Sequence, residues 1–337
     1  MNLHKMISEQ FNISNMDFNN DKNKKSNIFN KKIYDYKEIY NNIIHNDSNG
    51  QKCTRDDEIE YMDTLYSVIM VENNYMLRRV VNYYSNYYPK HSLNWLNVSL
   101  IENMSRLFSI THYDGDISEW DVSNVKDMTA MFRSSVFNEN ISKWDVSHVT
   151  SMKWMFSDSV FDQDISQWDV SNVTDMSCMF LKSKFDHDIS QWDVSNVTKM
   201  TKMFNKSIFN KDISEWNVSG VETMSWMFEN SKFNMDISNW EVSAVADMEN
   251  MFAFSLFNQD ISRWNVSNVA NMSYMFFYSN FNGDISGWDV SNVTDTSYMF
   301  AHSNFKNDIS NWKINKILFN HCMFDYCKIP EKYKPKL

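Results

Sequence analysis

Serine is the residue that this sequence places most regularly where it could act as a nucleophile. Two serine series recur every 24 residues through eight units. The first series is Ser123, Ser147, Ser171, Ser195, Ser219, Ser243, Ser267 and Ser291, and the second is Ser135, Ser159, Ser183, Ser207, Ser231, Ser255, Ser279 and Ser303. A serine nucleophile needs one base beside one hydroxyl, whereas these serines are copied in the same surroundings. The pattern therefore predicts helix caps and turn hydrogen bonds rather than catalysis.

Carboxylates recur with the same period and could in principle form a cation site. Asp164, Asp188, Asp212, Asp236, Asp260, Asp284 and Asp308 precede an Ile-Ser pair, and Asp121, Asp145, Asp169, Asp193 and Asp289 follow a tryptophan. Stacked carboxylates could bind calcium between turns. However, Asn140 interrupts the first series, Asn217, Glu241, Asn265 and Lys313 interrupt the second, and the glycines that shape calcium-binding repeats are absent. Backbone capping by aspartate is the favoured interpretation, and calcium binding is the alternative.

The cysteines and histidines form no recognisable catalytic or metal-binding pattern. Cys53, Cys178, Cys322 and Cys327 lack the spacing of a zinc site or of a disulfide framework. The eight histidines are scattered, and the sequence contains no phosphate-binding loop and no nucleophile–base pair. We therefore expect no catalytic residue, no metal and no cofactor, and we predict that the chain is not an enzyme.

All these series belong to one repeat, which is marked by a tryptophan every 24 residues from Trp120 to Trp312. Such a period decides the architecture, because one unit cannot bury a core and stacked units can. Within a unit, residues 164–170 suit short extended segments, and the apolar residues between 171 and 180 recur at helical spacing. We therefore predict an α/β solenoid in which each unit contributes one short strand and one short helix. Trp95 begins an earlier, divergent unit.

The chain before the repeats divides into two parts. Residues 1–52 are rich in Asn and Lys, and we predict that they are largely disordered or weakly ordered, since they offer little apolar surface to offset chain entropy. Residues 53–94 contain two helical patterns, of which the second covers Asn74–Tyr84 and is followed by Pro89. We predict that these helices form an N-terminal cap over the first hydrophobic layer. An independent adaptor domain is the alternative for this segment.

The repeat unit is similar to that of a known family. Its sequence, Phe-Asn-x-Asp-Ile-Ser-x-Trp-Asp-Val-Ser-Asn-Val-Thr-Asp-Met-Ser-x-Met-Phe, closely resembles the BspA-like leucine-rich-repeat surface protein family. The resemblance covers a repeat domain at residues 95–325 and leaves 326–337 as a C-terminal tail. It implies a leucine-rich-repeat-like, right-handed solenoid without known catalysis, used in adhesion or in protein–protein contact. Bacterial members usually have signal peptides and wall or lipid anchors. This chain shows neither, and its Asn/Lys/Ile-rich N-terminus is more like that of a protist or giant-virus protein.

We expect function at the positions that differ between units, because the invariant positions build the scaffold. Aromatic residues gather at two such positions, which are the residue ten after each repeat tryptophan and the pair after each Met-Phe. The candidate partner-binding residues are Trp154, Trp226, Phe254, Tyr274, Phe277, Tyr278 and Tyr298. A row of exposed aromatic rings is typical of a protein-binding surface. The alternative is lateral packing of these rings on the surface of the rod.

Charge and hydropathy narrow the class of partner. The formal net charge is −11, and residues 1–52 hold 8 Lys and Arg against 6 Asp and Glu, so the acidity lies in the rest of the chain. An acidic surface argues against non-specific nucleic-acid binding. No apolar run is long enough to span a bilayer, and the N-terminus lacks the pattern of a secretory signal. We therefore expect no membrane insertion and an intracellular location (the host cytoplasm or the virion, if viral) rather than secretion. We also expect a monomer.

The predicted function is that of a non-enzymatic repeat scaffold that mediates protein–protein interaction with an unidentified protein partner. Two alternatives remain open. The first is a cell-surface or virion-surface adhesin of the BspA-like type. The second is an adaptor that recruits a partner through residues 53–94.

Overall fold

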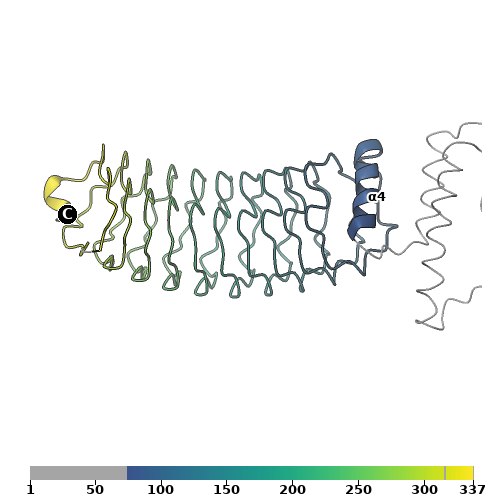
Figure 1. The fold of residues 1–337 in the computed structure, drawn as a ribbon, viewed down its shortest axis with the longest axis horizontal. Coiled ribbons are helices and arrows are strands. Elements are labelled where there is room, and N and C mark those ends of the chain that lie inside the picture. Colours follow the sequence, from purple (N-terminus) through teal and green to yellow (C-terminus); the bar gives the residue numbers. More distant parts are fainter. Residues whose placement is uncertain (1–73, 315, 337) are drawn as a thin grey trace, which may run out of the picture. The chain divides into compact units, whose positions relative to one another are not determined.

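The computed structural model describes residues 74–314 and 316–336 (Figure 1). The chain divides into two units, Met1–Leu65 and Tyr66–Leu337, and the described residues all belong to the second unit. The predicted disorder of residues 1–52 and the first predicted helix of the 53–94 segment lie outside the described residues.

The helix α4 (Asn74–Tyr87) precedes the repeats. Its Leu77, Val81 and Tyr84 follow one another at helical spacing on one face, and they are buried in the same hydrophobic core as the repeats. The helix ends shortly before Pro89, since proline disfavours helical backbone in the residue before it. The second helix predicted from the sequence is thus confirmed, and it lies against the first repeats.

Each 24-residue unit forms one coil of a continuous stack. Nine isolated parallel bridges join successive coils, from Asn103–Asp127 to Asp295–Phe319, and each joins a residue to the one 24 positions later. Figure 1 shows the coils following one another side by side in chain order. The period of the tryptophans in the sequence is therefore the period of the backbone pairing.

The backbone of each coil is neither helix nor strand, because its N–H groups alternate between two kinds of acceptor. In one coil, the N–H groups of Met176, Cys178, Phe180 and Lys182 donate to carbonyl oxygens of the following coil. Between them, the N–H groups of Met179 and Leu181 donate to the carbonyl three residues earlier in the same coil, and that of Ser177 donates to the Asp175 carboxylate. With every second donor used between coils, the i to i−4 bonds of an α-helix cannot form. The short helix predicted for residues 171–180 is therefore wrong, and turns with one bridge residue take its place.

Two residues of each coil adopt a left-handed backbone conformation. They lie 10 and 14 residues after the repeat tryptophan, and we call them the first and second left-handed positions. The described residues include twenty such non-glycine residues, with φ between 51° and 63°. Each costs about 1–2 kcal/mol relative to ordinary helical backbone. The coils can turn almost without glycine or proline because hydrogen bonds to neighbouring coils fix these residues in the strained conformation.

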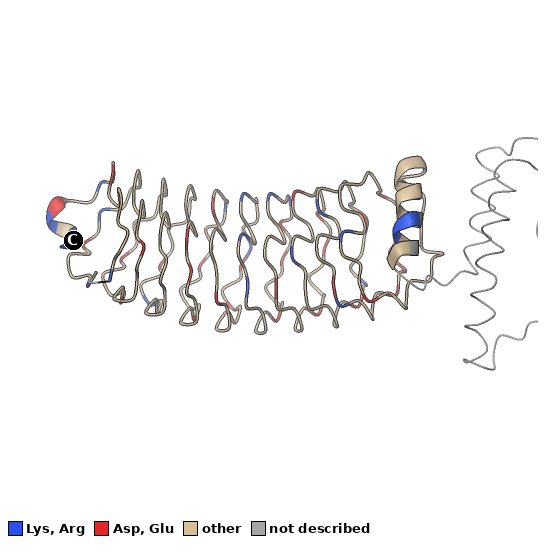
Figure 2. Ribbon diagram, viewed as in Figure 1, with Lys and Arg blue, Asp and Glu red and all other residues tan. Residues whose placement is uncertain are grey.

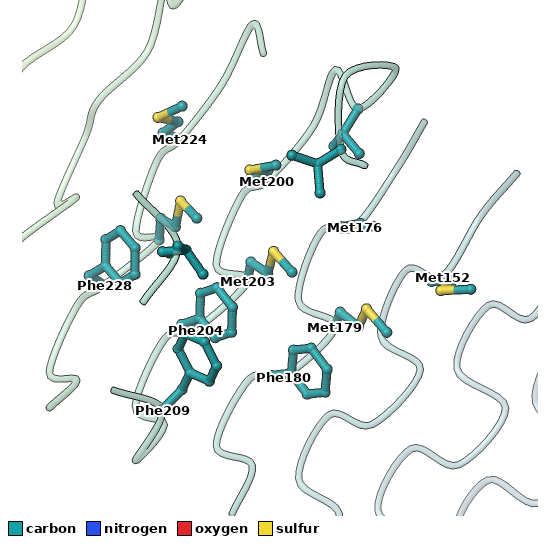
Figure 3. Close-up of a cluster of buried hydrophobic side chains, with 14 of the residues drawn as sticks. Met152, Met176, Met179, Phe180, Met200, Met203, Phe204, Phe209, Met224 and Phe228 are labelled. Carbon is teal, nitrogen blue, oxygen red and sulfur yellow. The ribbon is translucent and has the colours of Figure 1, made fainter. Parts of the chain in front are cut away.

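The interior consists of ladders of identical side chains (Figure 3). Fully buried methionines recur in register, as do the phenylalanines. The ring centroids of Phe180 and Phe204 lie 5.7 Å apart, and those of Phe204 and Phe228 lie 5.8 Å apart. Each repeat tryptophan is buried as well, and its indole N–H donates to a carbonyl 27 residues earlier, which belongs to Leu93 for Trp120 and to an isoleucine for the others, as Ile141 for Trp168 at 3.1 Å. Flexible thioethers fill the space between the rings, so the units form one continuous core.

The C-terminal coil departs from the repeat but extends further than the sequence predicts. Asn320 stands where the preceding ladder has methionine or threonine. The segment predicted as a tail, 326–337, contributes the buried side chain of Ile329 to the core. It also contains the 3₁₀ helix η2 (Glu331–Tyr333), whose last carbonyl accepts the backbone N–H of Ile309 at 3.0 Å. The boundary at residue 325 is therefore too early, since residues beyond it pack against the stack.

Glycine substitution tests the strain at the left-handed positions. Lys182 has a φ of 54° and an exposed side chain, whereas the exposed Lys184 lies outside the left-handed region. We expect Lys182→Gly to be more stable than Lys184→Gly by about 1 kcal/mol, because both variants gain chain entropy on unfolding but only the first relieves strain. Urea unfolding followed by tryptophan fluorescence measures the difference. Equal midpoints would show that residue 182 is not strained.

Thr296 offers a test of the core. It occupies the ladder position that is Met272 in the preceding coil, and its buried hydroxyl has no hydrogen-bond partner among the described residues. We expect Thr296→Met to raise the free energy of unfolding by about 1–3 kcal/mol, because the change removes an unsatisfied polar group and restores apolar contact. The control is Thr294→Val, which removes a hydroxyl that donates to the Ala270 carbonyl at 3.0 Å and should lower stability. A lower unfolding midpoint for Thr296→Met would contradict this account.

Candidate functional site

The candidate residues lie in the turns of five coils. Trp154, Trp226, Tyr274 and Tyr298 occupy the first left-handed position, and Phe254 and Tyr278 occupy the second. Phe277 directly precedes the second position in its coil. Because the backbone conformation repeats every 24 residues, side chains at equivalent positions leave successive coils in the same direction and form ladders along the stack.

Four rings form a continuous ladder at the second left-handed position. The rings belong to Phe254, Tyr278, His302 and Tyr326, and neighbouring centroids lie 5.4, 4.2 and 4.6 Å apart with interplanar angles of 11–16°. Phe254 is 47% exposed, Tyr278 is 49% exposed and Tyr326 is 81% exposed. This ladder is therefore both stacked and accessible to solvent.

A second, shorter ladder adjoins the first. Tyr274 and Tyr298 stack with centroids 4.8 Å apart and an interplanar angle of 11°. Phe277 lies between the ladders and meets Tyr274 and Tyr278 edge-on, at 5.3 and 4.8 Å. We call these residues together the aromatic strip; it comprises Phe254, Tyr274, Phe277, Tyr278, Tyr298, His302 and Tyr326.

The aromatic strip unites five of the candidate residues and adds two that were not predicted. His302 and Tyr326 belong to it because they continue the ladder of Tyr278 at 24-residue steps. The 24-residue register, extended into the degenerate last unit, is the signal that could have identified Tyr326.

The stacking determines which part of each ring faces solvent. Neighbouring rings cover both faces of Tyr278 and His302, so the ring edges and the tyrosine hydroxyl are the accessible parts. Ring edges are electropositive, and a protonated hydroxyl donates a hydrogen bond. A hydrogen bond with Cys322 raises the pKa of Tyr298 above the ordinary tyrosine value. Lateral packing and exposure, which were alternatives at the level of sequence, thus occur together.

Trp154 and Trp226 lie apart from the aromatic strip, in basic surroundings. The guanidinium carbon of Arg133 lies 4.7 Å from the ring centroid of Trp154, and the ammonium of Lys202 lies 4.6 Å from that of Trp226. Each ring therefore holds a positive charge over its face. The structure does not bring these two tryptophans together with the other five candidate residues.

The turns of the coils nearer α4 present further basic side chains. We call this set the cationic strip; it comprises Arg106, Arg133, Lys153, Lys182, Lys202 and Lys206. Lys206 pairs with Glu229 at 3.8 Å, whereas the other five form no ion pair with another described residue. Figure 2 shows basic residues in the coils near α4 and again at the C-terminal end, with few between them.

The buried thiol of Cys178 lies within the electrostatic influence of three of these cations. Burial raises the pKa of Cys178 to about 11, and the positive charges of Lys202, Lys153 and Arg133 act in the opposite direction. Arg133 and Lys153 come from the two coils before that of Cys178, and Lys202 comes from the coil after it. Positive charges from three of these four neighbouring coils therefore act on one region of the cationic strip.

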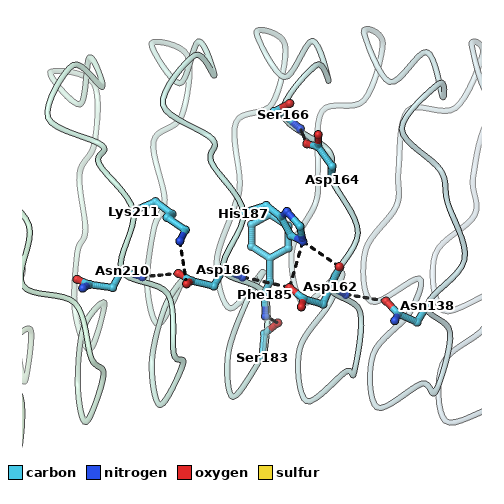
Figure 4. A network of polar contacts seen from close by, with 10 residues as sticks. All are labelled: Asn138, Asp162, Asp164, Ser166, Ser183, Phe185, Asp186, His187, Asn210 and Lys211. Atoms are coloured by element: carbon cyan, nitrogen blue, oxygen red, sulfur yellow. Dashed lines mark hydrogen bonds and ion pairs between the residues drawn. The ribbon is translucent and has the colours of Figure 1, made fainter.

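A further set of polar ladders supports the coils (Figure 4). The side-chain Oδ1 atoms of Asn138 and Asp186 accept the backbone N–H groups 24 residues later, at 2.8 and 2.9 Å, and Asp162 does the same at 3.4 Å. Asp162 and Asp186 follow each other in this ladder, and their negative charges repel each other. His187 lies 3.4 Å from Asp162. The ammonium of Lys211 lies 3.1 Å from Asp186, and its positive charge compensates part of the repulsion.

The repeated aspartates and serines bind backbone groups, as the sequence predicts. The Asp193 carboxylate accepts the backbone N–H of Ser195 at 3.0 Å, and Asn217 does the same for its own neighbour through the amide oxygen. In the second serine series, the Ser183 hydroxyl accepts the backbone N–H of Phe185 at 3.0 Å. These residues thus take part in the turn hydrogen bonds of the coils.

The remaining reactive side chains are dispersed over residues 74–314 and 316–336. No group of three or more His, Cys, Asp or Glu in these ranges could hold a metal ion. Cys178, Cys322 and Cys327 are free thiols, and Cys53 lies outside the described residues.

Comparison with known proteins finds a family that shares the repeat. The model of the family described as "Mycoplasma protein of unknown function, DUF285" matches residues 76–184, 157–256 and 233–333. The matches overlap, and each is longer than four 24-residue units, so the family model describes an array of such units. No curated protein and no solved structure matches the chain. In the part of the chain that the structure describes, no helix has the length and apolar character needed to cross a membrane.

The aspartate caps make stability depend on acid. Hydrogen bonds from the hydroxyl and the backbone N–H of Ser195 lower the pKa of Asp193 below 3.8, and the equivalent serines do so for Asp145 and Asp289. A carboxyl group whose pKa is lower in the folded state stabilises the fold above its unfolded pKa, and this stabilisation is lost as the pH falls through the folded pKa. We expect the thermal midpoint to fall below about pH 4.

The triple variant Asp145→Asn, Asp193→Asn and Asp289→Asn should show a smaller fall, because an amide oxygen keeps the acceptor without titrating. Thermal unfolding at about pH 7 and about pH 3 measures the effect. Asp158→Asn is the control, since no described backbone N–H donates to that carboxylate. An equal loss of stability in the triple variant and the native chain would exclude the caps as the cause.

Proposed function

The chain belongs to the DUF285 family, and from this membership and the geometry of its turns we propose that it is a non-enzymatic scaffold that binds another protein through the aromatic strip. The observation that supports this most is the exposure of Phe254, Tyr278 and Tyr326 in one continuous ladder. Contiguous exposed apolar surface is unusual in a soluble protein and typical of interfaces. Aromatic side chains also contribute a large share of binding energy at such interfaces.

The architecture in this proposal is a right-handed, leucine-rich-repeat-like solenoid, related to the BspA-like proteins, in which each unit has turns and one bridge residue in place of the short helix. The repeat motif around each tryptophan and the parallel pairing at 24-residue steps support it. A monomer fits the same picture, because α4 lies against the first repeats and the segment around Ile329 packs against the last. A solenoid of this kind offers a long ladder of turns as a binding surface.

A binding role is favoured over catalysis because the recurring reactive groups are already engaged. The hydroxyl of Ser183 and the carboxylate of Asp193 accept backbone hydrogen bonds, and their equivalents in other coils do the same. A catalytic site needs groups that differ from their copies in neighbouring units. The residues that differ most between coils are instead the aromatic and basic side chains of the two strips.

A protein is favoured over a nucleic acid as the partner. Single-stranded nucleic acids bind by stacking bases on the faces of aromatic rings. In the aromatic strip the faces of Tyr278 and His302 are covered by their neighbours, and the whole chain has a net charge of −11. Ring edges and hydroxyls suit the backbone and side-chain acceptors of a protein.

The proposal is tested by affinity capture with the full chain and with the triple variant Phe254→Ser, Tyr278→Ser and Tyr298→Ser. We expect the variant to lose a bound protein by about 30-fold in affinity, since loss of interface hot spots costs about 2 kcal/mol or more. The matched control is Tyr75→Ser with Leu256→Ser, which removes two exposed apolar side chains outside the aromatic strip. Quantitative mass spectrometry of the captured proteins, with circular dichroism to verify folding, provides the measurement. Retention of every partner by the folded triple variant would rule out the aromatic strip as the binding surface.

A further inference from the structure

The cationic strip stands out against the charge of the chain. The two left-handed positions of its five coils, from Arg106 to Lys206, include one acidic residue, Asp158. The chain as a whole has 43 acidic residues against 32 basic ones. Five of the six basic side chains have no carboxylate partner among the described residues, and two of them lie over tryptophan rings. Unpaired positive charge is therefore concentrated on one ladder of an otherwise acidic protein.

The aromatic strip continues the same ladder and prefers the same kind of ligand. Both strips occupy left-handed positions and their neighbours in one continuous stack, in which the coil of Trp226 and Asn230 lies between them. The accessible ring edges are electropositive, and the tyrosine hydroxyls donate hydrogen bonds. Both strips thus attract acceptor groups, but only the aromatic strip adds apolar contact.

The dimensions of the ladder fit an extended peptide. Successive coils paired like parallel strands lie about 4.8 Å apart, so the four steps from Arg106 to Lys202 span about 19 Å. The five further steps to Cys322, in the coil of Tyr326, add about 24 Å. An extended chain rises about 3.3 Å per residue, so about 13 residues would cover both strips.

We infer that the partner binds through an extended acidic segment of its chain, whose carboxylates lie along the cationic strip and whose apolar residues lie along the aromatic strip. This inference rests on the proposed function and specifies its ligand. Complementary charge sets the orientation of the segment, since its more acidic end must face the coils near α4. The acidic remainder of the protein surface repels the same segment and directs it to this ladder.

A synthetic peptide provides the test. The probe is a fluorescein-labelled peptide of about 14 residues with Glu at alternate positions, Ser between them in one half and Leu between them in the other. The matched peptide has Lys in place of Glu. Fluorescence anisotropy with the full chain measures both dissociation constants, at about 50 and about 300 mM NaCl.

Two charge-reversal variants with the same net charge identify the surface. Arg106→Glu with Lys182→Glu alters the cationic strip, whereas Lys143→Glu with Lys232→Glu alters exposed lysines elsewhere. We expect the Glu peptide to bind the native chain. Its dissociation constant should rise about tenfold at high salt, and about tenfold for the first variant. For the second variant it should change by less than about twofold. The Lys peptide should not bind.

Each other outcome overturns the inference and points to a different ligand. Equal binding of the Glu and Lys peptides, or equal loss in both variants, would exclude recognition by the cationic strip. Tighter binding of an oligouridylate of the same length would indicate a nucleic acid. Salt-sensitive self-association of the native chain that Arg106→Glu with Lys182→Glu abolishes, without peptide binding, would indicate a second copy of this chain.

The proposed function can fail or stand independently of this inference. If the aromatic triple variant loses its captured proteins while the Arg106→Glu and Lys182→Glu variant keeps them, and no Glu peptide binds, the scaffold function stands and the acidic segment is excluded. If neither variant changes capture, the proposed binding surface fails as well.

Discussion

The hydrogen bonds between coils are the constraint on which the rest of this structure depends. At alternate residues of each turn, the N–H group is committed to a carbonyl of the next coil, and the parallel bridges join residues 24 positions apart. An insertion within a paired segment would put the donors of that coil out of line with the acceptors of the coils beside it. The exact copying of the tryptophan period from Trp120 to Trp312 is therefore a geometric requirement. It also explains why the chain turns without glycine, since the paired backbone fixes the left-handed residues.

Because the register is fixed, each residue lies beside the equivalent residue of the next coil. Whether this contact stabilises the stack depends on the side chain. Identical apolar residues gain contact, so phenylalanine, methionine and tryptophan form ladders in the core. An asparagine can accept a backbone N–H from the next coil without a charge, as Asn138 does. Two successive aspartates repel each other, and the stack places His187 and Lys211 beside Asp162 and Asp186. The contact of each residue with its own copy in the next coil thus restricts the residue types at the surface as well as in the core.

Much of this could be predicted from the sequence, because periodicity directly encodes the register. The buried positions, the aspartate and serine bonds to backbone, and the helix at Asn74–Tyr84 follow from spacing and residue type. The short helix in each unit was predicted wrongly because a turn with bonds three residues apart buries nearly the same positions as a helix, such as Met176 and Met179. Only the competing bonds to the next coil distinguish the two, and those are not local. Tyr326 was missed because its unit had lost the motif that defines the register.

The left-handed positions separate what the fold requires from what it leaves open. Glycine or asparagine would relieve the strain there, yet Asn230 and Asn250 are the only described residues of those two types at these positions. The remaining positions hold basic, aromatic, small or other side chains at a cost of about 1–2 kcal/mol each. At the core positions, by contrast, the residues are those that pack best. At the turns, ring stacking and cation–π contacts offset part of this cost, as between Tyr278 and His302 and between Arg133 and Trp154. The ladder from Arg106 to Tyr326 varies in sequence where the core does not, and for this reason it is the surface at which we propose that a partner binds.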